Sequence, residues 1–372
     1  MRDGKNRINL QKKRDTTVRR NTAAAVSLFS LQKGSDMEQT AGKQSISFTE
    51  PVHIISSASV VGPKEGEGPL GDGFDLIAPE ADFGEETWEQ AESTMQQEAL
   101  QLAIGKAGLK SRDIRYLFGG DLLAQLTATS FGSEETQIPL FGLYSACSTC
   151  GEALALAALT VSAGCAEHVA AVTSSHFGSA EKEFRLPLGY GSQRPLSATW
   201  TVTGSGAFVL GKRGGHVRIS GVTPGKIVDM GSRDNMNMGA CMAPAACDTI
   251  ERNLQDFGRT PSDYDRIITG DLGAVGKRIL LDLLEEKGID IGAQHMDCGI
   301  EIYDSEVQDT HSGGSGCGCA ASTLSALILP KLRRGSWKRV LFVPTGALLS
   351  KVSFNEGKTI PGIAHAIILE HC

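Results

Sequence analysis

The chain has 372 residues, a formal net charge of −7 and 41% hydrophobic residues, which is typical of a globular protein with one large or two medium-sized domains. No apolar run approaches the roughly 20 residues that a bilayer-spanning helix needs. Residues 1–36 carry nine Lys/Arg and three Asp/Glu, so the remainder has a net charge of −13. This acidic body argues against nucleic-acid binding, which depends on clustered Lys and Arg side chains.

Cysteine usage and the N-terminal segment bear on the cellular compartment. The nine cysteines are an odd number, and several lie in apolar runs, which favours a reduced intracellular protein over a disulfide scaffold. Residues 1–36 are polar and basic. Their one apolar run, at 23–29, is interrupted by serine and lacks a clear cleavage site. We therefore expect residues 1–36 to form a disordered basic extension rather than a signal peptide.

In the first half of the chain, apolar runs alternate with helical patterns. A Gly- and Pro-rich loop at 62–73 and a polar excursion at 176–198 interrupt this pattern. The predicted helices lie at 86–106 and 150–163. The predicted strands lie at 52–55, 114–118, 138–144, 168–173 and 207–210.

The second half repeats this order. The predicted strands lie at 217–222, 266–269, 340–343 and 366–369. The predicted helices lie at 244–257, 280–287 and 317–332, the last preceded by a glycine-rich loop at 313–316. Strands that alternate with helices at this spacing indicate an α/β protein with parallel-rich sheets.

A short internal repeat links the two halves. Residues 113–122 and 263–272 lie 150 positions apart, and both end an apolar run in Gly-Asp-Leu. Downstream, each half has a cysteine before an Ala/Leu-rich helix, Cys147 in the first and Cys317 in the second. We therefore predict two related halves, 37–212 and 213–372, with one shared site where they meet.

The two helices that follow these cysteines are apolar all round. Residues 153–159 have no polar face, and residues 320–329 carry only small hydroxyl groups. Such helices are buried on all sides, and these are too short to span a membrane. We expect them to form the central layer of a five-layer αβαβα sandwich built from the two pseudo-equivalent halves.

Several motifs carry a family resemblance. Residues 145–149 (SACST) and the helix after them resemble the nucleophile elbow of β-ketoacyl synthases of the third type, which have the thiolase fold. Over about residues 37–372, eight strings in order resemble the stage V sporulation protein AD family. They are GPK (62–64), GPLG (68–71), GGDLL (119–123), ACST (146–149), TSSH (173–176), TVTGSGA (201–207), MAPAA (242–246) and GGSGC (313–317).

The resemblance implies a spore-forming bacterium and a protein that binds dipicolinic acid, with calcium, for uptake into the developing spore. It implies membrane subunits of the same uptake system as partners. The expected location is therefore inside the developing spore, peripheral to its inner membrane through those partners. The usual pairing of this fold through a sheet edge implies a homodimer. No nucleic acid and no resident cofactor are expected; calcium would accompany dipicolinate as cargo.

Cys147 is the main candidate for chemistry. A thiol at a helix N-terminus has a lowered pKa, and the free N–H groups there bind anions, so Cys147 is either a nucleophile or the floor of a carboxylate pocket. Condensing enzymes of this fold draw a His from the loop that holds Asp271 here, and a His or Asn from the loop at 313–316. Neither loop holds one, although His311 and His295 lie upstream of the second. We expect binding without catalysis; a Cys147-dependent β-ketoacyl synthase-like acyltransferase is the alternative.

The predicted ligand site combines the cysteine loop with glycine-rich and polar loops that follow strands. Its residues are Cys147, Ser148, Asp121, His176, Arg185, Gly313, Gly314 and Gly346. Arg194 is a further candidate partner for the carboxylates. Asp121 and Asp271 could hold the cysteine loops by hydrogen bonds or ligate calcium, with the first role favoured.

Other interpretations of these residues stay open. Cys147 and Cys150 could form a thioredoxin-type redox pair, and with Cys317 and Cys319 they could form a four-thiolate zinc site. Both are less favoured than packed thiols. The acidic side chains of Glu65, Glu67, Asp72 and Asp75 are expected to form a solvated face.

Overall fold

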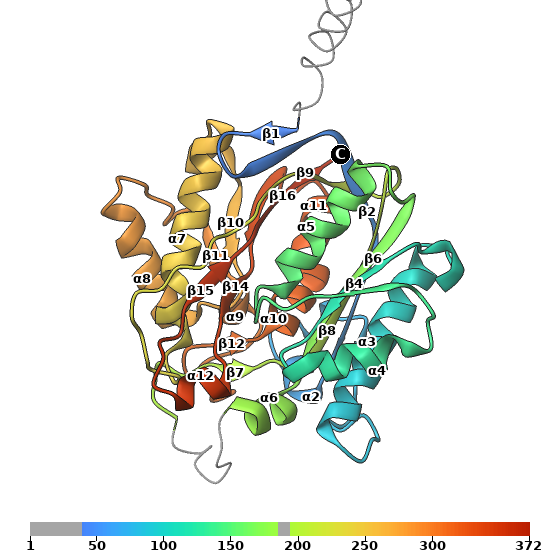
Figure 1. The fold of residues 1–372 in the computed structure, drawn as a ribbon, viewed down its shortest axis with the longest axis horizontal. Helices are drawn as coiled ribbons and strands as arrows, with labels where there is room; N and C mark the ends of the chain where they lie inside the picture. Colours follow the sequence, from blue (N-terminus) through green and yellow to red (C-terminus); the bar gives the residue numbers. More distant parts are fainter. Residues whose placement is uncertain (1–38, 185–193) are drawn as a thin grey trace, which may run out of the picture. The chain divides into compact units, whose positions relative to one another are not determined.

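The computed structural model describes residues 39–184 and 194–372. The chain divides into two units, Met1–Thr40 and Ala41–Cys372, and the second holds nearly all of the described elements (Figure 1). Among the described residues, no helix is both long enough and apolar enough to cross a bilayer.

Strands and helices alternate through the first half of the second unit, after β1 (Thr40–Ala41). The strands are β2 (Ser45–Val61), β3 (Leu76–Ile77), β4 (Leu117–Gly120), β5 (Leu140–Gly142), β6 (His168–Ser175), β7 (Trp200–Thr201) and β8 (Gly204–Gly211). The helices are α2 (Pro63–Gly66), α3 (Trp88–Lys106), α4 (Thr127–Glu134), α5 (Thr149–Ser162) and α6 (Phe177–Phe184).

The second half follows the same plan. Its strands are β9 (Val217–Thr223), β10 (Arg266–Thr269), β11 (His295–Asp297), β12 (Gly314–Ser315), β13 (Arg339–Val343), β14 (Thr345–Ala347), β15 (Gly362–Ala364) and β16 (Ala366–His371). Its helices are α7 (Met238–Phe257), α8 (Gly273–Glu285), α9 (Cys298–Glu301), α10 (Cys317–Thr323), α11 (Leu329–Arg333) and α12 (Lys351–Asn355).

The main sheet has the same strand order in both halves. The first half contributes β5-β4-β6-β8-β2 and the second β11-β10-β13-β16-β9. In each half the first three strands of that order pair parallel with one another. The fourth strand pairs antiparallel with both the third and the fifth. The long strand β2 also pairs antiparallel with β9, and so joins the two halves edge to edge. The predicted pair of equivalent halves is confirmed by this matching order.

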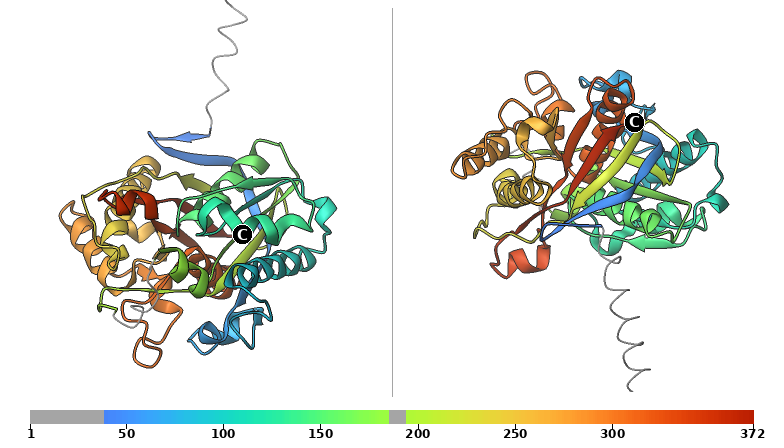
Figure 2. Two further views of the ribbon diagram at one scale, coloured as in Figure 1. Left: turned by 60° about the horizontal axis from the view of Figure 1, so that its bottom comes forward. Right: turned by 90° about the horizontal axis from the view of Figure 1, so that it is seen from above.

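The sheets and helices form the five predicted layers. In Figures 1 and 2, α3 and α7 lie on opposite sides, with α5, α10 and α11 between them. The central helix α5 contacts β4 and β6 of the first half and β16 of the second, which explains why it has no polar face. The thiolase-like sandwich is therefore confirmed.

Successive side chains along a strand point to opposite faces of the sheet, and so belong to different hydrophobic cores. On β8, Ala207 and Val209 belong to the core beneath α3, whereas Phe208 and Leu210 belong to the core around the central helices. A third core lies between α7 and the second half's sheet, where Ile250 on the helix belongs to the same cluster as sheet residues.

The second central helix is not a regular α-helix throughout. The predicted helix at 317–332 consists of α10, a π-helical segment at Leu324–Ile328, and α11. Pro330 lies at the start of α11. Because proline lacks an N–H and its ring collides with the carbonyl of the preceding turn, the wider π turn accommodates it without ending the helix.

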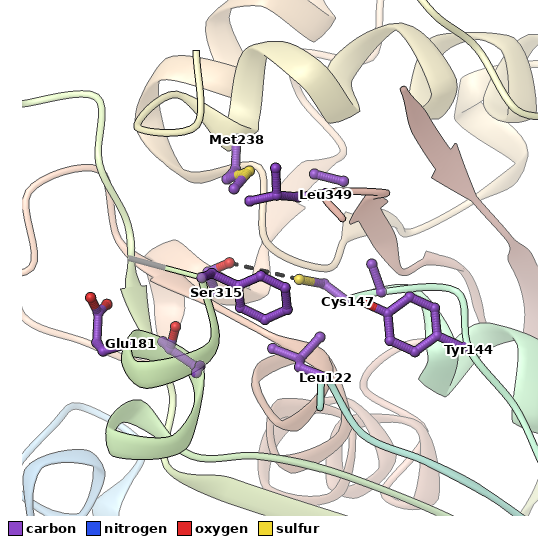
Figure 3. Close-up of a pocket in the computed structure, with 12 residues that line it drawn as sticks. Leu122, Tyr144, Cys147, Glu181, Met238, Ser315 and Leu349 are labelled. Atoms are coloured by element: carbon purple, nitrogen blue, oxygen red, sulfur yellow. Dashed lines mark hydrogen bonds between the residues drawn. The ribbon is translucent and has the colours of Figure 1, made fainter. Parts of the chain in front are cut away.

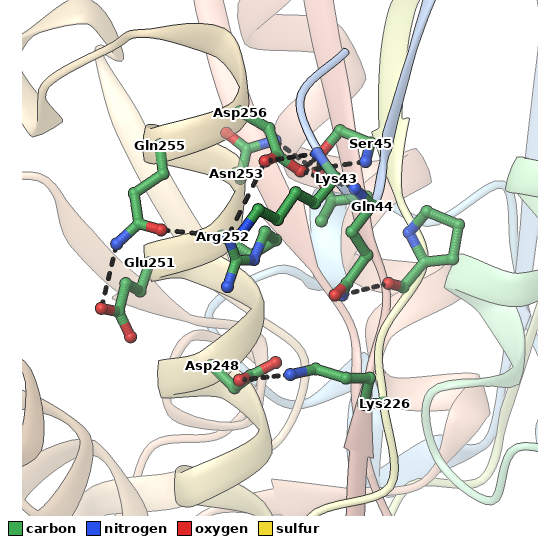
Figure 4. Close-up of polar contacts among 12 residues, drawn as sticks. Lys43, Gln44, Ser45, Lys226, Asp248, Glu251, Arg252, Asn253, Gln255 and Asp256 are labelled. Carbon is green, nitrogen blue, oxygen red and sulfur yellow. Dashed lines mark hydrogen bonds and ion pairs between the residues drawn. The ribbon is translucent and has the colours of Figure 1, made fainter. Parts of the chain in front are cut away.

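Asp256 near the end of α7 anchors the entry to β2 (Figure 4). Its carboxylate accepts hydrogen bonds of 3.0 Å from the backbone N–H groups of Lys43, Gln44 and Ser45, and one of 2.9 Å from the Ser45 hydroxyl. Gly42 has a φ of 57°, and a side chain there would collide with Asp256. A residue of the second half thus fixes the first strand of the first half.

Some predicted boundaries were wrong for identifiable reasons. The helix predicted at 244–257 begins at Met238; Pro244, a residue type that is common at the first position of a helix, lies inside it instead. The polar excursion at 176–198 contains α6. The helix predicted at 280–287 begins at Gly273, since its first turn follows directly from the Gly-Asp-Leu motif.

Candidate functional site

Cys147 lies on a sharp turn before α5. Ala146 has a φ of 47°, a left-handed conformation that is uncommon for a residue with a side chain. Ser148 is the N-cap, and the helix begins at Thr149. The thiol therefore precedes the helix by two residues, and the helix begins one residue before its predicted start at 150.

The backbone donors of this turn are bound within it. The N–H groups of Ser148 and Thr149 donate to the carbonyls of Ser145 and Ala146, each at 3.1 Å. The Ser148 hydroxyl donates to Ser145 O at 2.8 Å and is fully buried. Ser148 thus stabilises the turn, and these groups are not free for the anion-binding role predicted for them.

The Cys147 side chain lines a pocket with an empty volume of about 480 Å³ (Figure 3). Its wall is mainly apolar and draws on both halves of the chain. The lining residues are Leu122, Tyr144, Ala146, Cys147, Ala180, Glu181, Phe184, Thr201, Met238, Ser315, Ala347 and Leu349. Ser315 Oγ lies 3.9 Å from Cys147 Sγ.

A wider cavity adjoins this pocket. It has an empty volume of about 970 Å³ and shares Leu122, Tyr144, Phe184 and Leu349 with the Cys147 pocket. Lys351 lines this outer cavity. The two cavities meet at these shared residues.

Asp271 occupies the start of α10, where an anion would otherwise bind. Its carboxylate accepts hydrogen bonds from Ser315 Oγ and Gly316 N, each at 2.9 Å, and from Thr345 Oγ1 at 2.7 Å. Burial raises the pKa of this fully buried carboxyl to about 6, although these hydrogen bonds oppose the rise. Asp271 was expected either to hold the cysteine loops by hydrogen bonds or to ligate calcium, and these contacts match the first role.

The Cys147 thiol is in an environment that disfavours its thiolate. Burial raises its pKa well above the usual value, and the neighbouring Asp271 carboxylate raises it further. This is opposite to the lowering expected at a helix N-terminus, because burial and the carboxylate outweigh the donors of Ser315 and Gly316. At neutral pH the thiol stays protonated, which makes it a poor nucleophile.

Neither of the two histidines that the sequence offered as candidate partners lines the Cys147 pocket. His295 is hydrogen-bonded to Thr269, and burial lowers its pKa to about 3. His311 contacts the Pro195 carbonyl at 2.9 Å and the Asp309 carboxylate. Within the described ranges, the residues lining the Cys147 pocket include no histidine.

Asp121 and His176, two other residues of the predicted site, lie outside the Cys147 pocket. Asp121 accepts hydrogen bonds from Leu123 N and Thr129 N at 2.8 Å, and from Thr129 Oγ1 at 2.6 Å, so its carboxylate holds the loop before α4. It does not line the Cys147 pocket. His176 lies in another cavity, together with Trp88. Arg185 falls outside the described residues.

The predicted glycines shape the loops around the thiol. A side chain at Gly346 would collide with the Ser145 carbonyl and the Ser148 N–H, so this position allows β14 to approach the cysteine turn. Gly314 on β12 pairs with Trp200 on β7. Gly313 has a φ of 119°, which favours glycine.

Arg194 and Glu65 differ from the predictions made for them. Arg194 binds the Asp309 carboxylate at 2.8 Å and does not line the Cys147 pocket. Glu65 is 1% exposed and accepts hydrogen bonds from Thr203 N and the Tyr303 hydroxyl, so it is not part of a solvated acidic face. Sequence patterns could not reveal these partners, because they are distant along the chain.

The cysteine alternatives find little geometric support. All nine cysteines are free thiols. The described parts of the chain contain no group of three or more His, Cys, Asp or Glu side chains that could hold a metal ion. Cys147 and Cys317 do pack in one small cluster with Leu122 and Ala180.

Sequence reasoning missed most of the pocket wall. Tyr144, Phe184, Met238 and Leu349 resemble ordinary core residues in the sequence, and only the fold brings them together. Leu122, Thr201 and Ser315 were detectable, because each lies inside one of the quoted motifs.

Comparisons with known proteins agree with this architecture. Residues 42–370 match the family model for stage V sporulation protein AD. The stage V sporulation protein AD of Bacillus subtilis (strain 168) is 43% identical over 329 residues, which cover 88% of this chain and 97% of that protein.

Solved structures show the same fold at low identity. The 3-oxoacyl-[acyl-carrier-protein] synthase III of Aquifex aeolicus VF5 is 14% identical, with a TM-score of 0.52 over 86% of this chain and 100% of that one. A variant of Xanthomonas campestris OleA is 15% identical, with a TM-score of 0.55 over 87% of this chain and 99% of that one. Family model and relative together show that the chain belongs to the stage V sporulation protein AD family.

Proposed function

We propose that the Cys147 pocket binds dipicolinate together with calcium, without catalysing acyl transfer, and that this binding serves uptake into the developing spore. Family membership gives the protein a role in sporulation. The ligand comes from the resemblance of the motifs, and the location of the Cys147 pocket between residues of both halves supports a small-molecule site there.

One observation carries the choice of binding over catalysis. Asp271 stands in the loop that provides a histidine in condensing enzymes, and its carboxylate helps to keep the Cys147 thiol protonated. A condensing cysteine needs a base and a stabilised thiolate, and this arrangement opposes both. The site therefore keeps the sharp cysteine turn of a nucleophile elbow, while the neighbouring carboxylate disfavours the thiolate.

The apolar wall favours a neutral ligand complex. Dipicolinate is a planar dianion, and one calcium ion cancels its charge. Transferring a free dianion into an apolar pocket costs more than transferring the neutral pair. The rings of Tyr144 and Phe184 offer flat surfaces for the pyridine ring. We therefore propose calcium as cargo that enters with the ligand rather than as a resident metal.

Calorimetric titration with dipicolinate, with and without calcium, tests this proposal. We expect saturable binding that calcium strengthens and that Cys147→Phe abolishes by filling the pocket. Cys147→Ala should retain weaker binding, since it removes one contact and no charge. A complete lack of heat at saturating dipicolinate and calcium, with a folded protein, would rule the proposal out.

The competing proposal is acyl transfer by Cys147. The strained turn at Ala146 is the observation in its favour, because it presents the thiol to a pocket as a nucleophile elbow does. Mass spectrometry after incubation with acyl thioesters distinguishes the two. An adduct on the Cys147 peptide that is absent from Cys147→Ala supports the enzyme and contradicts our preference.

We also propose a homodimer, and membrane subunits of the uptake system as partners. The edge strand β5 supports the dimer: among the described strands it pairs only with β4, and Leu140 and Phe141 are 39% and 50% exposed. An unpaired apolar edge strand is a surface that a second copy can cover.

A further inference from the structure

A second cavity, which we call the aromatic pocket, lies away from Cys147. Its empty volume is about 450 Å³, and its wall includes Lys64, Glu65, Trp88, His176, Phe177 and Trp200. It shares no lining residue with the Cys147 pocket, although α6 and residues 200–203 contribute to both walls. The two cavities therefore lie on either side of a common wall.

Stacked rings form the apolar surface of the aromatic pocket. Trp88 stacks on His176 with ring centroids 5.3 Å apart, and Phe177 stacks on Trp200 at 3.9 Å. Trp88 is 43% exposed, so this side of the pocket is open. His176 Nδ1 accepts the Gly178 N–H, and its Nε2 therefore carries the proton and donates to Ala81 O at 2.7 Å. His176 therefore presents a neutral ring to the pocket. Burial lowers its pKa, which also favours the neutral form.

Two cations converge on Trp200. The Lys64 ammonium lies 4.5 Å from the ring centroid and the Arg194 guanidinium 4.9 Å from it. The Arg194 side chain is only 9% exposed, and its Nη1 has no hydrogen-bond partner among the described residues. Lys64 Nζ donates to the Gln308 carbonyl at 2.5 Å, which leaves further N–H donors on the same ammonium.

Arg194 is paired with the Asp309 carboxylate, but the one acidic group in the described wall does not balance the charge of Lys64. Glu65 is buried, and burial raises its pKa, which favours the neutral carboxylic acid. Its Oε1 accepts from Thr203 N at 3.0 Å, whereas its buried Oε2 has no partner among the described residues. Buried polar atoms without partners are rare, and Glu65 lines the aromatic pocket, so its unpaired Oε2 points to a missing ligand there.

We propose that the aromatic pocket is a second binding site, which takes a small planar aromatic carboxylate. The ring would lie against the open tryptophan surface, and the carboxylate would accept from Lys64, which lines the pocket. A cationic ligand is disfavoured, because Lys64 and Arg194 already hold the cation–π positions over Trp200. The site does not depend on the proposed function of the Cys147 pocket, and it suits a metal-free anion where that pocket suits a neutral complex.

Tryptophan fluorescence isolates this site. The chain has three tryptophans, and Trp337 lies beside Arg266 in the second half. In a Trp337→Phe variant the remaining two, Trp88 and Trp200, both line the aromatic pocket. Titration of this variant with pyridine-2-carboxylate should give saturable quenching without calcium. Benzylamine, which has a ring but no anion, and cyclohexanecarboxylate, which has an anion but no flat ring, should not quench it.

Two further variants in the Trp337→Phe background assign the signal. Lys64→Gln should weaken the pyridine-2-carboxylate affinity by about tenfold, because it removes a charge-assisted contact. Cys147→Phe should leave that affinity unchanged. The absence of saturable quenching, or quenching that survives Lys64→Gln and disappears in Cys147→Phe, would overturn the proposal. If the proposed function of the Cys147 pocket is wrong, calorimetry will show no calcium-dependent dipicolinate binding. That result is independent of the fluorescence titration.

Discussion

The Asp271 carboxylate accepts a 2.9 Å hydrogen bond from the Ser315 hydroxyl, the group that contacts the Cys147 thiol. A buried acid thus lies in the loop from which, by the family resemblance, condensing enzymes of this fold draw a histidine. It links the two cysteine loops of the duplicated fold and contributes to the protonation state of the thiol. The preference for binding over catalysis follows from this acid and from the lack of a histidine in the loop.

Asp271→Asn should make Cys147 more reactive. Removing the negative charge beside the thiol lowers its pKa, because the thiolate no longer faces a carboxylate. We expect alkylation by iodoacetamide at neutral pH to rise by about tenfold, measured on the Cys147 peptide by mass spectrometry. Asp121→Asn is the matched control at the equivalent position of the first half, and should leave the rate unchanged. Equal rates in the wild type and Asp271→Asn would contradict the role of this charge.

Asp271 should also make stability depend on pH. Its folded pKa of about 6 lies above the unfolded value of about 3.9, so between these pH values the folded state holds a proton that the unfolded state has lost. The free energy of unfolding should therefore fall as pH rises from 4 to 6, by up to about 3 kcal/mol from this group. Urea unfolding at several pH values should show this fall in the wild type relative to Asp271→Asn. A constant difference between the two proteins would contradict it.

Asp256→Ala should destabilise the junction of the two halves. It leaves the N–H groups of residues 43–45 without their acceptor, and we expect a loss of about 2 kcal/mol in the free energy of unfolding. The control is Asp248→Ala on the same helix, which removes only a surface ion pair with Lys226 and should cost less than about 1 kcal/mol. Similar losses of unfolding free energy in both variants would show that the Asp256 hydrogen bonds stabilise the fold no more than a surface ion pair does.

Gly346→Val should disrupt dipicolinate binding through the cysteine turn. The new side chain would collide with the Ser145 carbonyl and displace the loop that presents Cys147. We expect at least about a tenfold weaker affinity by calorimetry. Gly105→Ala, on the open face of α3, has no atom within 4 Å of the added carbon and should bind as the wild type does. Unchanged dipicolinate affinity in Gly346→Val would show that the cysteine turn is not part of the binding site.

Phe141→Lys should convert the proposed dimer into a monomer. A charge on the exposed edge strand β5 opposes pairing with a second copy. Light scattering coupled to size-exclusion chromatography measures the mass directly. Ile227→Lys, a charge at another exposed apolar residue, is the control and should not change the mass. A wild-type monomer at high concentration would contradict the dimer itself.

The architecture was predictable from the sequence because the relevant signals are local or repeated. The all-apolar segments at 153–159 and 320–329 identified the central layer, and the duplicated Gly-Asp-Leu motif identified the two halves. Period and composition are properties of contiguous residues, so they are visible without the fold.

The site was predicted only in part because its determinants are distant in sequence. Cys147 and the glycine-rich loop before Cys317 were found by motif, whereas Tyr144 and Phe184 are apolar residues whose position in a wall depends on packing. The sign of the pKa shift at Cys147 was also wrong. A helix start suggests a lowered value, but the thiol of the half-buried Cys147 is desolvated and Asp271 approaches it from 124 positions away, and neither fact is visible in the sequence.

A dipicolinate and calcium soak of crystals tests the central claim most directly. We predict density for the planar ligand in the Cys147 pocket, against Tyr144 and Phe184, with an intact Cys147 thiol beside it. An empty Cys147 pocket at saturating ligand, or a covalent adduct on Cys147, would contradict the claim.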